Sequence, residues 1–214
     1  MKRKFLLWDH DGVLVDTEKW YFAATQRALV TLGVEMDQRI YLDLMADGRG
    51  YWEAAHRNGY TDEDIAQSRR LRDKIYQEYL TTQPIEMDGV TEVLSDLGQS
   101  HRMAIVTTAR RADFELIHRS RSIRRHFEFV ITADDCTEHK PSPQPYRMAL
   151  DRFGAKPEEA LVIEDTSRGL RSAIAAGIDC VIIYNEFTAS QDFTGAWHMI
   201  PSIRDLPALL AAEL

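Results

Sequence analysis

Two aspartates separated by a single residue stand at the end of the first apolar segment. The run KFLLW leads directly into DHDGVLVDTE, which places Asp9 and Asp11 two positions apart. In an extended chain, side chains two residues apart project from the same face. Two carboxylates this close repel each other, which favours protonation of one of them unless a cation lies between them. The pair therefore indicates either an ordinary turn or a site that binds a positive charge.

Polar residues with matching chemistry follow three other apolar runs. MAIVT ends in Thr107, ALVIE ends in Glu164 with Asp165 next, and the loop after FEFVIT carries Lys140. Ligands of open parallel sheets bind at the carboxyl ends of the strands, so we expect these side chains to meet at one edge. Clustered carboxylates need a counter-charge, and Mg²⁺ prefers oxygen ligands. Because a lysine and a threonine suit phosphoryl oxygens, the set predicts a phosphoryl-transfer site in which Asp9 could be the nucleophile.

Strands and helices that would position these residues alternate from about Pro84 onward. Apolar runs of strand length lie at 103–107, 127–132, 160–164 and 180–184, and helix-like segments lie around 90–98, 112–120, 142–153 and 168–176. This alternation is typical of a parallel sheet covered on both faces. The run KFLLW must join the same sheet, because the segment that follows it contains no convincing strand.

Residues 18–82 carry a helical pattern instead, with apolar residues at three- and four-residue steps, as at Ala24 and Ala28. The sequence therefore predicts an α/β fold with two domains. A Rossmann-like parallel sheet core is formed by residues 1–17 and 83–214, and an α-helical cap, residues 18–82, is inserted after the first strand.

The composition of the 214-residue chain is that of an ordinary globular protein, with a net charge of −8. This charge argues against nucleic acid as a partner. Apolar runs are too short for a membrane span or a signal peptide, so we expect no membrane association. The two cysteines, Cys136 and Cys180, form neither a disulfide framework nor a metal motif, which favours a reducing cytoplasm. We expect a monomer or a weak homodimer.

Four stretches of the chain resemble, in order, the four motifs of the haloacid dehalogenase superfamily: DHDGVLVDT, the strand-end Thr107, Lys140 in HKPSP, and IEDTSRGLRSAIAAG. The chain is most similar to the subfamily I branch that contains β-phosphoglucomutase and phosphoglycolate phosphatase. The resemblance implies that Asp9 forms an aspartyl-phosphate and that Asp11 is the general acid and base. It also implies that Thr107 and Lys140 hold the transferring phosphate. The implied Mg²⁺ ligands are Asp9, Asp11, Glu164 and Asp165.

The function that this resemblance implies is Mg²⁺-dependent hydrolysis of a small phosphorylated metabolite. A sugar-phosphate mutase is the alternative, although Tyr21 stands where the mutases carry a histidine on the first cap helix. A phospho-acceptor switch also combines acids, a hydroxyl and a lysine at strand ends, but receiver domains are compact and lack a helical insertion. Arg49 and Arg110 are candidate substrate contacts. His10 departs from the family pattern, which usually has an apolar residue between the two aspartates.

Overall fold

The structure is a computed structural model that describes residues 3–46 and 50–212. The chain divides into two compact units, and each is described by itself below. One unit consists of Met1–Asp16 and Glu86–Leu214, and the other of Thr17–Ile85. The helical insertion predicted at residues 18–82 lies within the second unit.

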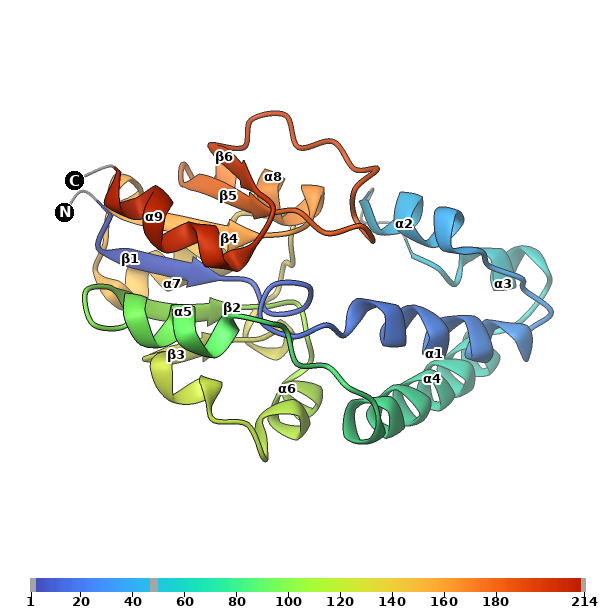
Figure 1. The fold of residues 1–214 in the computed structure, drawn as a ribbon. Coiled ribbons are helices and arrows are strands. Elements are labelled where there is room, and N and C mark those ends of the chain that lie inside the picture. The colour runs from blue at the N-terminus through green and yellow to red at the C-terminus, as the bar shows by residue number, and fades with distance from the viewer. Residues whose placement is uncertain (1–2, 47–49, 213–214) are drawn as a thin grey trace. The chain divides into compact units, whose positions relative to one another are not determined.

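A six-stranded, all-parallel sheet forms the centre of the first unit, with the strand order β3-β2-β1-β4-β5-β6 (Figure 1). The strands are β1 Phe5–Trp8, β2 Arg102–Val106, β3 Phe129–Ile131, β4 Ala160–Glu164, β5 Asp179–Ile183 and β6 His198–Ile200. The predicted α/β fold is confirmed, with the first strand placed between β2 and β4. Strand β6 was not predicted, because it is only three residues long and two of them are exposed.

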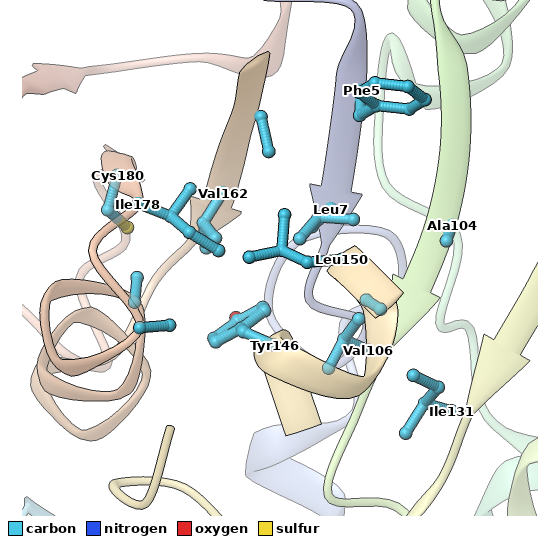
Figure 2. Packing of buried hydrophobic residues seen from close by; sticks show 14 of the residues in the cluster. Phe5, Leu7, Ala104, Val106, Ile131, Tyr146, Leu150, Val162, Ile178 and Cys180 are labelled. Atoms are coloured by element: carbon cyan, nitrogen blue, oxygen red, sulfur yellow. The ribbon is translucent and has the colours of Figure 1, made fainter. Parts of the chain in front are cut away.

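The inner strands are apolar along their whole length because both faces of the sheet are covered. Every residue of β1 and β4 is buried. On one face, α7 (Gln144–Phe153) and α8 (Ser167–Ala175) pack against the strands. Figure 2 shows the resulting core, in which Tyr146 and Leu150 of α7 lie among strand side chains such as Leu7.

The opposite face lies beneath α5 (Val90–Leu97) and α9 (Leu206–Ala211), two helices that contact each other (Figure 1). Four residues of α5 are buried, at positions that recur every three or four residues: Val90, Val93, Leu94 and Leu97. The remaining helix of this unit, α6 (Arg111–His118), follows β2.

The regular elements among the described residues of the second unit are all helices. The unit contains α1 Glu18–Val30, α2 Gln38–Ala46, α3 Glu53–Arg57 and α4 Asp62–Thr82. Helices α1 and α4 pack along each other, and the Ser68 hydroxyl of α4 donates to the Ala28 carbonyl of α1 at 2.8 Å. Thr61 begins α4 with a capping box to Asp64. No helix in the described part of the chain is long and apolar enough to cross a membrane.

The packing of the sheet predicts the effect of shortening one side chain. Ile182 of β5 is fully buried in the hydrophobic core cluster that includes Tyr146 and Leu150, whereas Ile174 of α8 is 47% exposed. We expect Ile182→Ala to lower the free energy of unfolding by about 3 kcal/mol, because it leaves a cavity. The matched variant Ile174→Ala should change it by about 0.5 kcal/mol or less. Equal losses in urea unfolding would contradict the assigned core.

Candidate active site

The register of the sheet brings the carboxyl ends of its central strands together. Trp8, the last residue of β1, pairs with Ile105 of β2 and Ile163 of β4. The next residue, Asp9, continues the ladder, since its backbone N–H donates to the Ile163 carbonyl at 2.8 Å. The residues that follow β1, β2 and β4 therefore lie at one edge of the sheet, as the strand-end rule predicts.

Lys140 supplies a positive charge at this edge of the sheet, and its side chain is almost fully buried. Nζ donates to Asp9 Oδ1 at 2.6 Å, to the Val106 carbonyl at 2.8 Å and to Glu164 Oε1 at 2.8 Å. An ammonium group has three N–H donors, and all three have acceptors here. Lys140 therefore links the strand ends of β1, β2 and β4.

Glu164 receives hydrogen bonds on both carboxylate oxygens. Oε1 accepts from Lys140 and from the Tyr146 hydroxyl at 3.1 Å, and Oε2 accepts from the Asp165 and Thr166 backbone N–H groups and the Thr166 hydroxyl at 2.9–3.1 Å. Burial opposes ionisation, but the Lys140 charge and these hydrogen bonds outweigh it and lower the pKa of Glu164. A Cβ atom on Gly169 would overlap this carboxylate, so the position requires glycine.

Asp9 has the opposite electrostatic balance. Burial and the nearby Glu164 charge raise its pKa to about 7, although Lys140 acts in the other direction. The pKa values of Asp9 and Glu164 shift in opposite directions because Glu164 accepts most of the local hydrogen bonds. A cation placed near Asp9 would favour its ionised form.

Three buried carboxylates, those of Asp9, Glu164 and Asp165, each offer an oxygen within 4.8 Å of the others. Asp165 Oδ2 accepts from the Asn185 amide at 2.8 Å, which orients the carboxylate. Gly12 has a φ of +80°, and a Cβ there would overlap Asp165, so the turn after Asp11 must carry glycine. Three carboxylates beside a single lysine leave excess negative charge, and their hard oxygen donors fit Mg²⁺.

The Asp11 carboxylate lies outside this group of three. Its Oδ2 accepts from the Thr107 hydroxyl at 3.3 Å and lies 3.3 Å from His10 Nδ1. The Thr107 oxygen in turn accepts from the Ala109 backbone N–H at 2.9 Å. Asp11 and Thr107 therefore join the same edge as Asp9, but as a second hydrogen-bonded pair.

Of the two predicted substrate contacts, Arg110 lies among the described residues. Arg110 precedes α6 and bonds to Asp113 with its Nε at 2.8 Å from Oδ2. Arg49 lies outside the described residues. Sequence reasoning missed Tyr146 and Asn185. Asn185 follows a strand end and could have been found by the rule that located Asp9, whereas Tyr146 has the pattern of a core residue.

A parallel α/β core with buried carboxylates and a lysine at its strand ends defines the class: an enzyme whose site suits a divalent cation. The family model "Haloacid dehalogenase-like hydrolase" matches residues 6–183. The chain belongs to this family, which confirms the predicted superfamily and makes it a hydrolase.

Individual relatives cover nearly the same length. The protein CbbY of Rhodobacter capsulatus is 30% identical over 215 residues, covering 95% of each chain. Fructose-1-phosphate phosphatase YqaB of Escherichia coli is 27% identical over 180 residues, which covers 82% of this chain and 94% of YqaB. A crystal structure of a CbbY variant from Rhodobacter sphaeroides in complex with xylulose-1,5-bisphosphate superposes with a TM-score of 0.81. It is 26% identical and covers 95% of this chain and 96% of that one.

The raised pKa of Asp9 predicts how Asp9→Asn changes stability in EDTA. At Asp9, the folded wild type binds more protons than the unfolded chain between about pH 4 and pH 7, so the contribution of this group to stability falls as pH rises through this range. The asparagine oxygen still accepts from Lys140 but carries no charge. We expect the melting temperature of the variant to exceed that of wild type by an amount that grows towards pH 7 and then levels off.

The control for this prediction is Asp96→Asn, which removes an exposed carboxyl on α5. Its melting temperature relative to wild type should change little with pH. A stability gain for Asp9→Asn that is the same at acid and neutral pH would contradict the electrostatics described for Asp9.

Proposed function

We propose that this hydrolase is a Mg²⁺-dependent phosphatase that acts on a small phosphorylated metabolite through an aspartyl-phosphate on Asp9. The observation that supports it most is the bond from Lys140 to Asp9 Oδ1 at 2.6 Å inside a buried acidic cluster. This arrangement places a nucleophilic oxygen beside a cation that can also attract a phosphoryl group. The fructose-1-phosphate phosphatase and the bisphosphate-bound CbbY variant among the relatives favour the same substrate class.

In the first step, a carboxylate oxygen of Asp9 attacks phosphorus and the bond to the ester oxygen breaks. Asp11 gives its proton to that oxygen, so the product leaves as a neutral alcohol. Lys140 is proposed to attract the phosphoryl oxygens by its charge. Phosphate binding by Thr107 stays a prediction, because its one hydroxyl hydrogen points to Asp11 in the structure. Because Asp11 follows Asp9 by two residues, we expect it to lie within reach of the leaving group.

In the second step, water attacks the phosphorus of the aspartyl-phosphate while Asp11 takes the proton from the water. The bond between phosphorus and the Asp9 oxygen breaks, which releases inorganic phosphate and restores the carboxylate. Asp11 ends protonated, as it began, so the cycle is balanced.

Asp9 and Asp165 are the residues that we assign to the cation, with Glu164 beside them. Mg²⁺ would neutralise charge on these carboxylates and on the phosphoryl oxygens. Glu164 already accepts five hydrogen bonds, so we assign it chiefly to anchoring Lys140. Ligation by Asp11 stays a prediction.

Residues 18–82 are proposed to form a cap that selects the substrate. Within this unit, Arg72 donates to the Tyr21 hydroxyl and its guanidinium lies over the Tyr21 ring. Tyr21 occupies the position at which a mutase would carry its cap histidine. Because this position carries a tyrosine that contacts Arg72, and no histidine, it does not favour the mutase alternative.

The test is a screen of purified protein against a panel of phosphorylated metabolites, with Mg²⁺ or with EDTA. We expect Mg²⁺-dependent release of inorganic phosphate, and a loss of about 10³-fold or more for Asp9→Asn. Asp96→Asn should keep wild-type activity. Full activity in EDTA, or most of the activity retained by Asp9→Asn, would overturn the proposal. Conversion of a sugar phosphate to its isomer without phosphate release would favour a mutase.

A further inference from the structure

His10 lies between the two aspartates and is completely buried. Its Nδ1 is 3.3 Å from Asp11 Oδ2, and its Nε2 is 2.9 Å from Nε2 of His118, the last residue of α6. The Phe114 ring lies 5.0 Å from the His10 ring and 4.4 Å from the His118 ring, measured between centroids. The two imidazoles therefore form a packed pair that ends at the Asp11 carboxylate.

The hydrogens of this pair can be assigned from its contacts. A short distance between two imidazole nitrogens requires that one carries a hydrogen and the other accepts it. Burial, with smaller contributions from His10 and nearby arginines, lowers the pKa of His118 to about 3, so this ring is neutral at physiological pH. Its Nδ1 is buried and has no hydrogen-bond partner among the described residues. A bare nitrogen is favoured there, since a buried N–H without an acceptor would be costly.

The hydrogen of His118 then lies on Nε2 and is donated to His10 Nε2. His10 Nε2 is the acceptor and carries no hydrogen, so the ring hydrogen of His10 lies on Nδ1, facing Asp11. The reverse assignment would point a lone pair of His10 at a carboxylate oxygen. It would also leave an N–H of His118 in its partnerless buried position.

We propose that His10 is a positioning residue for Asp11, with its tautomer fixed by His118. The Nδ1–H of His10 and the hydroxyl of Thr107 both donate to Asp11 Oδ2. Both hydrogen bonds fix the Oδ2 end of the carboxyl group. The pair thus orients the carboxyl group that protonates the leaving group, a role that rests on the proposed function.

The test compares kcat/KM for two kinds of phosphate ester in the presence of Mg²⁺. An alkyl phosphate needs its leaving oxygen to be protonated, whereas p-nitrophenyl phosphate has a leaving group that needs little help. His10→Leu removes the donor to Asp11. His10→Asn keeps an N–H near the position of Nδ1. His118→Leu and His118→Gln make the same comparison at the second ring, and His198→Leu, at an exposed histidine, is the control.

We expect His10→Leu to lower kcat/KM for the alkyl ester by about 10- to 100-fold, less than the full contribution of an acid catalyst. The loss for p-nitrophenyl phosphate should be a few-fold, and His10→Asn should restore most of the activity on the alkyl ester. His118→Leu should show the same selectivity to a smaller degree, with recovery in His118→Gln. Circular dichroism identifies any variant that does not fold.

Asp11→Asn separates failure of this inference from failure of the proposed function. Suppose that Asp11→Asn shows the selective loss of kcat/KM on the alkyl ester. If the folded His10 and His118 variants then lose kcat/KM equally on both esters, or not at all, the positioning role is wrong. If Asp11→Asn shows no selective loss, the acid role of Asp11 in the proposed function is wrong. A selective loss in His10→Leu that His10→Asn does not rescue would also overturn the inference, because the donor would not be what matters.

Discussion

The buried ammonium group of Lys140 between Asp9 and Glu164 is the interaction on which the site depends. Burying one lysine and two carboxylates is costly, and the cost is offset only if every charged group is hydrogen-bonded. Lys140 meets this condition with three acceptors from the ends of three neighbouring strands. The sheet order, with β1 between β2 and β4, is what makes these three acceptors available to a single side chain.

The distribution of donors around the two carboxylates separates their roles. Glu164 receives hydrogen bonds from Lys140, Tyr146 and the start of α8, so it stays ionised and fixed. Asp9 is left with a raised pKa and needs additional positive charge to ionise fully. A nucleophile of this kind becomes reactive when a cation binds, which links the proposed metal to the proposed chemistry.

The sequence was sufficient to predict the parallel sheet and the residues at its strand ends, because buried strands are apolar runs and polar residues follow them directly. The sequence was less informative for side chains whose pattern is also typical of a hydrophobic core. Tyr146 reads as a core residue of α7, and only the structure shows its hydroxyl on Glu164. His10 departed from the family pattern, but its link to His118 spans 108 positions and depends on how α6 packs. Such contacts leave no local pattern in the sequence.

The most direct test of the central claim is to locate the phosphoryl group on the protein. Enzyme with Mg²⁺ is mixed with radiolabelled acetyl phosphate, quenched in acid during a single turnover, reduced with borohydride and digested for mass spectrometry. The structure predicts an acid-stable label whose reduction converts only the side chain at position 9 to homoserine. Phosphate release with no labelled protein at any time, or a label at another residue, would contradict Asp9 as the nucleophile held by Lys140.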